Sequence, residues 1–288
     1  MTAPERDEFS GQATTGHDWD GIKELDNPLP RWWLMVFYAS IVWGIGYWVV
    51  YPAWPLISGY TEGVINYSSR AEVAAEIAAA DEAKRAYTDR IAASDLATIR
   101  NDQELMAFAL AGGKSAYGDN CAGCHGSAAQ GGKGYPNLSD DDWLWGGSLE
   151  AIQQTIQYGI RSAHDDTRDS EMPAFGRDEI LSRDQIAQVS EYVLSLSGKA
   201  ANAERAKLGA PIYAEQCIDC HGDKGQGNRE FGAPNLADAI WLFGSDAASV
   251  RNIVANSRKA VMPHWEGRLP AATIKQLAIF IHSLGGGE

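Results

Sequence analysis

Two short segments of the sequence combine residues that bind metals with residues that form covalent bonds. They read CAGCH at 121–125 and CIDCH at 217–221, and together they contain all four cysteines of the 288-residue chain. A C-x-x-C pair alone is compatible with a disulfide, a zinc ribbon or a thioredoxin-like redox site. A histidine directly after each pair is the signature of covalent c-type haem attachment. The sequence therefore predicts two covalently attached haem c groups.

Each residue type in the motif has a role in this interpretation. Two thiols of each motif add across the haem vinyl groups, and these thiols belong to Cys121, Cys124, Cys217 and Cys220. The adjacent His125 and His221 are the predicted proximal iron ligands, because the five residues of a motif wrap one helical turn. A satisfied core histidine is the competing interpretation, but it leaves the paired thiols unexplained.

The second axial ligand is predicted from the positions of the five methionines. Met1 is the initiator, Met35 lies in an apolar run, and Met106 precedes the first motif. Only Met172 and Met262 recur at matching places, each before a proline and ahead of a terminal helix. A thioether ligand favours ferrous iron and raises the reduction potential. We expect both methionines to be distal ligands, although core packing is the commoner role of methionine.

The residues around the two motifs repeat in the same order, which indicates two copies of one domain. Tyr117 and Gln130 recur as Tyr213 and Gln226, PNL recurs at 136 and 234, and QIAQVSEYVLSL aligns with TIKQLAIFIHSL. The predicted domains occupy 105–198 and 203–286, joined by the polar segment GKAANAER. We expect Pro136 and Pro234 to turn the chain around the haem. We also expect a set of matched aromatic residues to pack over a porphyrin edge, namely Trp143, Trp145, Trp241 and Phe243.

A membrane anchor precedes these domains. Residues 32–51 read WWLMVFYASIVWGIGYWVVY, twenty residues without a charge, which is the length of a transmembrane helix. Aromatic residues at both ends suit the membrane interfaces. A cleaved signal peptide is disfavoured, because the apolar run is too long and the preceding residues are acidic. We expect 1–31 to be a mostly flexible cytoplasmic tail, and everything after the span to be periplasmic, where bacteria attach haem c.

Residues 52–104 are predicted to form a periplasmic helical spacer. SRAEVAAEIAAADEAKRAYTDRIAA at 69–93 has a strong helix composition and is interpreted as a solvated helix. A second helix begins at Asp102 and is predicted to end at the glycine pair 112–113. The predicted fold is therefore all-α, with one N-terminal transmembrane helix followed by two tandem class I cytochrome c domains.

The charge balance limits the range of partners. A net charge of −14 and a pI near 4.8 exclude the basic surface that nucleic-acid binding requires, whereas a basic soluble cytochrome c is an electrostatically suitable donor. Protein ligands on both sides of each iron favour electron transfer over catalysis. No site role is assigned to the remaining histidines, which are His17, His164, His264 and His282.

Longer blocks of the chain resemble subunit III of cbb3-type cytochrome c oxidases, the CcoP or FixP family. They are WDGIKELDNPLPRWW, YPAWPLISGY, NDQELMAFALAGGKSAYGDNCAGCHG and YPNLSDDDWLWGG. The resemblance implies a single-pass subunit of the bacterial inner membrane without catalysis of its own. It would accept electrons from a soluble or membrane-bound cytochrome c or from the cytochrome bc complex. It would pass them to the monohaem cytochrome c subunit II and the haem-copper catalytic subunit.

Three points stay open at this level. A membrane-anchored dihaem subunit of a periplasmic dehydrogenase has the same cytochrome domains, and a dihaem peroxidase is an enzymatic alternative that needs one iron to open. The simple expectation pairs Met172 with the first motif and Met262 with the second. The resemblance also allows the two methionines to cross between the domains, and the repeat does not distinguish these arrangements.

Overall fold

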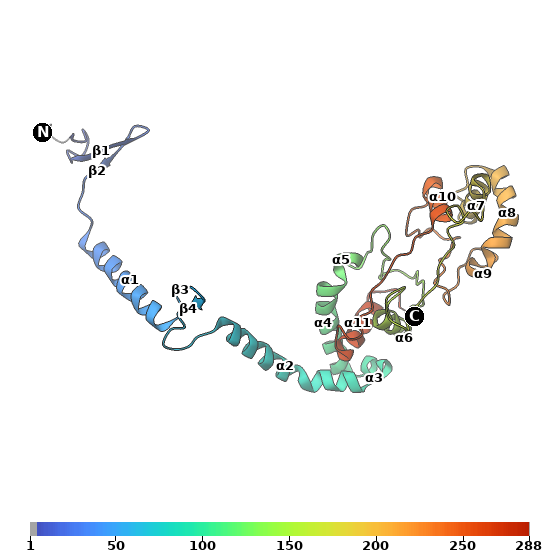
Figure 1. Cartoon of the computed structure of the whole chain (residues 1–288), viewed down its shortest axis with the longest axis horizontal. Helices are drawn as coiled ribbons and strands as arrows, with labels where there is room; N and C mark the ends of the chain where they lie inside the picture. Colours follow the sequence, from blue (N-terminus) through green and yellow to red (C-terminus); the bar gives the residue numbers. More distant parts are fainter. Residues whose placement is uncertain (1–4, 288) are drawn as a thin grey trace. The chain divides into compact units, whose positions relative to one another are not determined.

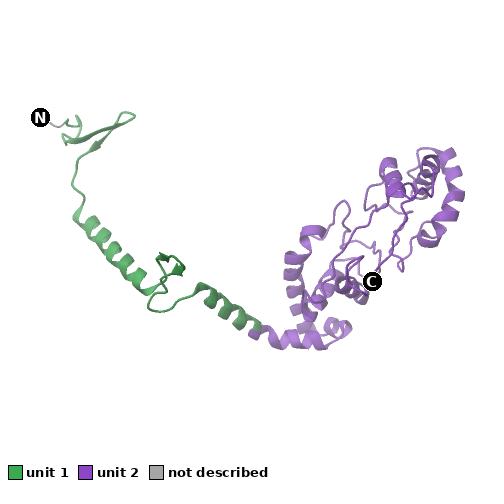
Figure 2. Ribbon diagram, viewed as in Figure 1, with its two compact units in different colours: residues 1–81 green, residues 82–288 purple. Residues whose placement is uncertain are grey.

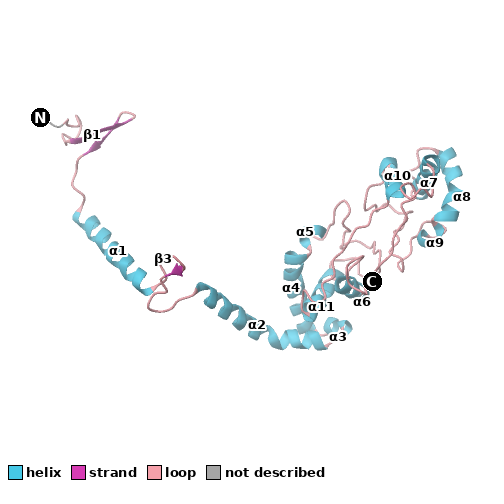
Figure 3. Ribbon diagram, in the orientation of Figure 1, coloured by secondary structure: helices cyan, strands magenta, loops and turns pink. Residues whose placement is uncertain are grey.

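The computed structural model describes residues 5–287, and its fold is mostly helical (Figures 1 and 3). The chain divides into two compact units, Met1–Asp81 and Glu82–Glu288, which are described separately (Figure 2). The predicted all-α class is confirmed, with short β-hairpins as an addition in the first unit.

The described part of the N-terminal segment forms a β-hairpin rather than the flexible tail that we predicted. Strands β1 (Thr14–Trp19) and β2 (Ile22–Leu25) pair in antiparallel fashion. Asp20 and Gly21 connect them, with φ angles of 51° and 90°. An Asp-Gly pair with two positive φ angles matches the twist of a hairpin, so this dipeptide was the sequence signal for the turn.

Helix α1 (Arg31–Val50) is the predicted membrane span, displaced by one residue from the range 32–51. It begins after Pro30, whose fixed φ suits a helix start, and Pro52 follows its end. Within the described residues it is the single helix long and apolar enough to cross a membrane. A short hairpin follows, made of β3 (Pro55–Leu56) and β4 (Gly59–Tyr60).

Helix α2 (Ser69–Ala93) has the predicted bounds, and most of its length is solvated as expected. Its last turn differs, because Ile91 is fully buried together with Ile99 of α3 (Leu96–Asn101). The Lys275 ammonium also donates hydrogen bonds to the carbonyl oxygen atoms of Ala92 and Ser94, at 2.8 and 2.6 Å. A cation at these carbonyl groups stabilises a helix C-terminus. The spacer is therefore attached to the cytochrome region by its end.

The remaining helices form two groups, which lie at opposite ends of the second unit (Figure 1). The first group contains α4 (Gln103–Asn120), α5 (Ala122–His125), α6 (Leu149–Tyr158) and α11 (Ala271–His282). The second group contains α7 (Arg183–Leu196), α8 (Ala203–Gln216), α9 (Ile218–His221) and α10 (Ala247–Asn256). The terminal helices of the two sequence repeats are thus exchanged: α11 packs against α4 and α6, while α7 packs against α8 and α10.

A glycine at each helix crossing allows the exchanged helix to approach closely. A Cβ atom on Gly113 would lie 2.3 Å from the backbone oxygen of Gln276 in α11. The matching Gly209 of α8 would place its Cβ 2.1 Å from the backbone oxygen of Gln188 in α7. The prediction that the second helix ends at glycines 112–113 is therefore wrong. Helix α4 continues to Asn120, and its glycines serve packing rather than termination.

Residues 197–202 connect α7 to α8, and a buried carboxylate holds this connection. Glu191 is 4% exposed and accepts hydrogen bonds from the backbone amides of Ala201 and Asn202, at 3.0 and 3.1 Å. The Asn202 side chain then caps α8 by accepting from the amide of Arg205. This short, fixed connection keeps the end of the first repeat beside the start of the second.

Candidate haem-binding sites

Each C-x-x-C-H motif forms one helical turn, as its spacing predicts. In the first motif the His125 amide donates to the Cys121 oxygen at 3.0 Å, and in the second the His221 amide donates to the Cys217 oxygen at 2.9 Å. A buried tyrosine fastens the end of each turn. The hydroxyl of Tyr117 donates to the carbonyl of Gly126 at 2.7 Å. Tyr213 makes the matching 2.8 Å contact in the second motif.

The carbonyl groups of the two PNL segments orient the motif histidines. His125 Nδ1 lies 3.0 Å from the Pro136 oxygen, and His221 Nδ1 lies 3.1 Å from the Pro234 oxygen. A carbonyl oxygen only accepts, so Nδ1 carries the proton and donates, which leaves Nε2 with its lone pair for a metal. Burial lowers the pKa of both imidazoles and thereby favours this neutral form. The orienting role of the proline carbonyl groups was not part of our sequence prediction.

The four thiols fall into two environments. Cys121 and Cys217 are the more enclosed pair, and burial raises the pKa of each thiol to about 11. Cys124 and Cys220 are exposed. None of the four forms a disulfide, and within the described part of the chain no cluster of His, Cys, Asp and Glu could hold a metal ion by itself. The four free thiols are compatible with the haem interpretation of the two motifs.

A cavity of about 480 Å³ lies beside the second motif and contains Met172 of the first repeat. Cys217, Cys220 and His221 line the same cavity. Its wall is largely apolar and is formed by Phe175, Val189, Val193, Val250 and Val254. A partly open cavity of this size with a predominantly apolar lining is compatible with a cofactor site. The residues present fit a haem group, with the imidazole and the thioether in one compartment.

Met262 lies with the first motif. It packs against a buried cluster that includes Cys121, Tyr117 and Trp265. Its backbone pairs with Ile160, and the two amide-to-carbonyl distances are both 3.0 Å. Gly159 permits this approach, since a Cβ there would lie 2.4 Å from the Met262 oxygen. The structure thus brings each methionine to the motif of the other repeat, which is the crossed arrangement of the two that the sequence left open.

The matched aromatic residues make a reciprocal contact between the two helix groups. Trp145 covers Gly232, where a Cβ would lie 2.2 Å from the indole ring. Phe243 covers the matching Gly134, whose Cβ would lie 3.3 Å from the phenyl ring. Trp145, which we expected to pack over a porphyrin edge, therefore also contacts the backbone of the other repeat. Trp241 and Phe243 line the cavity of the second motif.

Two histidines that received no site role lie close to each other beside the Met262 segment. His164 Nδ1 accepts from the Asp166 amide at 3.0 Å, so its Nε2 donates to the Glu266 carboxylate at 2.9 Å. The His264 ring centroid lies 5.5 Å from that of His164. This contact joins two loops that are distant in sequence, so no local pattern predicted it.

The structure contains two C-x-x-C-H turns with oriented histidines, and each turn lies beside a segment that carries a methionine. This arrangement defines a protein with two cytochrome c domains. Family models agree with this class. The cytochrome c model matches residues 110–197, and the model of cbb3-type cytochrome c oxidase subunit III matches 204–281. A third model, the N-terminal domain of cytochrome oxidase-cbb3, FixP, matches 11–58.

Curated relatives match over almost the whole chain. The FixP subunit of the cbb3-type cytochrome c oxidase from Bradyrhizobium sp. (strain ORS 278) is 55% identical over 99% of this chain and 98% of its own length. The CcoP subunit from Azospirillum brasilense is 48% identical over the full length of both chains. The CcoP subunit from Cereibacter sphaeroides is 51% identical over 96% of this chain and 95% of its own length.

The chain belongs to the FixP/CcoP family of cbb3-type cytochrome c oxidase subunits. The resemblance seen in the sequence is thereby confirmed. As a member of this family the chain is an electron-transfer subunit of a cbb3-type oxidase and carries c-type haem. The matches give no support to the alternative of a periplasmic dehydrogenase subunit.

Proposed function

We propose that the chain binds two haem c groups covalently and that their axial ligands are crossed between the repeats. Cys121 and Cys124 hold the first group, and Cys217 and Cys220 hold the second. His125 pairs with Met262, and His221 pairs with Met172. The observation that carries this proposal is that Met172, His221 and both cysteines of the second motif line the same cavity.

The protein residues around each site prepare it for electron transfer. When bound, haem c supplies one-electron exchange between ferrous and ferric iron. The proline carbonyl groups hold each imidazole with Nε2 unprotonated, and the cavity at the second motif has a predominantly apolar lining. His125 and Met262 would hold one haem group and His221 and Met172 the other, which would leave no open position at either iron for a substrate. We therefore propose that this chain alone does not catalyse oxygen reduction, which belongs to the haem-copper subunit.

We propose that the chain lies in the bacterial inner membrane with its N-terminus in the cytoplasm and its cytochrome region in the periplasm. Helix α1 supports the anchoring, and covalent haem attachment outside the cytoplasmic membrane supports the orientation. In this position the chain accepts electrons from a donor cytochrome c or the cytochrome bc complex. It delivers them to the monohaem cytochrome c subunit II and onwards to the haem-copper subunit.

A single-haem background tests the crossed ligation. Replacing Cys217 and Cys220 by alanine leaves one haem, at His125, and a pyridine haemochrome assay counts it. In that background Met262→Ala should convert the remaining iron to high-spin, whereas Met172→Ala should leave it low-spin. The reverse pattern would establish ligation within each repeat. Two haems per wild-type chain are expected, and a lower count would contradict the proposal.

A reporter fusion tests the orientation. Alkaline phosphatase, which folds in the periplasm, should be active when fused after Ala93. Green fluorescent protein, which folds in the cytoplasm, should be dark at the same position. An inactive phosphatase together with a fluorescent green fluorescent protein would show that the chain has the opposite orientation.

A further inference from the structure

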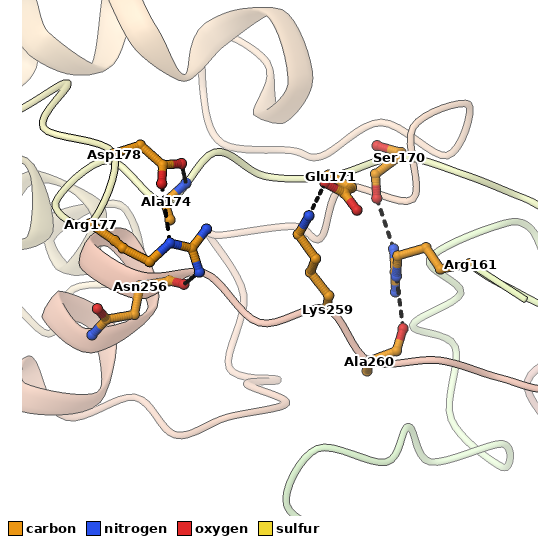
Figure 4. Close-up of polar contacts among 9 residues, drawn as sticks. All are labelled: Arg161, Ser170, Glu171, Ala174, Arg177, Asp178, Asn256, Lys259 and Ala260. Carbon is orange, nitrogen blue, oxygen red and sulfur yellow. Dashed lines mark hydrogen bonds and ion pairs between the residues drawn. The ribbon is translucent and has the colours of Figure 1, made fainter.

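The two segments that carry the methionines run side by side where they cross between the helix groups (Figure 4). Glu171, directly before Met172, forms an ion pair with Lys259, three residues before Met262. Further along, the Arg177 guanidinium donates to the Asn256 carbonyl at 3.5 Å. The two segments are therefore held together over several residues, on both sides of Met172 and ahead of Met262.

One side chain joins the two segments at matching positions. Arg161 Nε donates to the Ala260 carbonyl at 2.7 Å, and Nη1 of the same guanidinium donates to the Ser170 carbonyl at 2.8 Å (Figure 4). Ala260 and Ser170 each stand two residues before a methionine, Met262 and Met172 respectively. The planar guanidinium presents its donors in a fixed fork, so the two bonds set the separation of the two carbonyl groups.

The backbone around Arg161 fixes the origin of this fork. Arg161 has a positive φ of 50° and donates its amide to the Arg168 carbonyl at 2.8 Å. The preceding Ile160 pairs with Met262 itself. Arg161 also lines the cavity that contains Met172. Arg161 thus borders the compartment of the second motif. Its neighbour Ile160 holds the Met262 segment, which lies with the first motif.

The second repeat has Lys259 at the position equivalent to Arg161, but Lys259 makes different contacts. Lys259 follows α10 as Arg161 follows α6, but its ammonium pairs with the exposed Glu171 carboxylate at the rim. The side chains of Lys259 and Glu171 are 51% and 46% exposed. An ion pair this exposed contributes little to stability. Lys259 is therefore a matched control for Arg161. It lies at the same crossing and has the same charge, but it does not make the forked contact with two carbonyl groups.

We propose that Arg161 is a positioning residue for both distal methionines, and that its forked contact couples the ligation of the two haem groups. This inference rests on the crossed ligation proposed above. Loss of the fork frees Ser170 and Ala260 together, so both methionines lose part of their hold on iron at the same time. A contact that served one compartment alone would affect one haem.

Carbon monoxide binding to the reduced, haem-loaded full-length chain tests the coupling, since the gas binds only where the methionine leaves. Arg161→Gln should bind two molecules per chain and strengthen carbon monoxide binding about tenfold at each site, the order expected for one charge-assisted hydrogen bond per segment. Both reduction potentials should fall. Arg161→Lys keeps the charge but lacks the fork, and a smaller change at both haems is expected. Lys259→Gln should match the wild type.

The outcomes separate this proposal from the one on which it rests. Met172→Ala and Met262→Ala should each open one site, and if neither does, the proposed methionine ligation itself fails. If they behave as expected while Arg161→Gln opens one site or none, only the coupling by Arg161 is overturned. An equal effect of Lys259→Gln would also overturn it, because charge rather than the fork would then be responsible. If Arg161→Gln is not recovered with both haems, Arg161→Lys decides by the same criterion.

Discussion

The two candidate haem compartments follow one plan but differ in what supports them from outside. Both have a tyrosine that fastens the motif turn, a proline carbonyl that orients the histidine, and a glycine at the helix crossing. Among residues 5–287, a further apolar layer covers the first compartment but not the second: Ile91, Leu96 and Ile99 pack there with residues of α4, α6 and α11. The difference indicates that the first compartment is attached to the membrane-proximal spacer, whereas the second is held through the exchanged segments. Repeated sequence thus produces similar sites with unequal support.

The largest expected effect comes from blocking one helix crossing. Gly113→Val would force side-chain atoms into the Gln276 backbone, since even a Cβ lies 2.3 Å from its oxygen. We expect the free energy of unfolding to fall by about 4 kcal/mol and the haem at His125 to lose Met262 first. Chemical denaturation followed by haem absorbance measures this loss. Gly118→Ala, on the same helix with open space around it, is the control and should not destabilise the protein.

The additional layer provides the next test of the difference between compartments. Ile99→Ala removes a fully buried side chain and should cost about 3 kcal/mol. Hydrogen exchange should show faster opening of α4 and α11, with α7 and α8 unchanged. Ile77→Ala on the exposed part of α2 is the matched control, because Ile77 is 57% exposed. Equal destabilisation of both helix groups by Ile99→Ala would contradict the separate support proposed here.

The connection between α7 and α8 should have a smaller effect, limited to the second compartment. Glu191→Ala leaves the amides of Ala201 and Asn202 without their acceptor, and a loss of about 2 kcal/mol is expected. Met172 should dissociate more easily from the haem at His221, and the reduction potential of that haem should fall. Glu204→Ala changes an exposed carboxylate nearby and should have no effect. A matching shift at the haem of His125 would count against this assignment.

The smallest effect concerns the ends of the two matched helices α6 and α10. Gly159 and Ser257 occupy the same position, with φ/ψ of 75/−172° and 53/173°, a region that favours glycine. Ser257→Gly should therefore stabilise the chain by about 1 kcal/mol, detectable as a higher melting temperature. The reciprocal Gly159→Ser should destabilise, because its Cβ would meet the Met262 oxygen. If Ser257→Gly also destabilised, its side chain would have an undetected role.

Much of this arrangement follows from local patterns. The motif spacing indicated the helical turns of Cys121–His125 and Cys217–His221, and the uncharged run indicated α1. The Met-Pro context identified the two residues that the structure brings to the motifs. These features depend on residues that are close together in the sequence, so they could be predicted from the sequence alone.

The exchange of α7 and α11 could not be predicted, for a physical reason. The two terminal helices have equivalent apolar faces, and Gly113 and Gly209 accept either of them equally well by pattern. The choice depends on the connection at 197–202, held by Glu191, and on contacts such as that of Arg161 with Ser170. These interactions join residues without a shared periodicity. The hairpin turn at Asp20 had a local signal that our interpretation did not use.

The exchange also has a consequence for the order in which the protein is completed. Among the described helices α11 comes latest in the sequence, yet it packs in the compartment of the first motif. The compartment of the first motif is therefore complete only when the later helix α11 has been added. The compartment of the second motif uses α7, which precedes that motif in the sequence. A premature stop before Ala271 removes the closing helix from the site nearer the membrane anchor in sequence, and leaves the more distant site with its full set of helices.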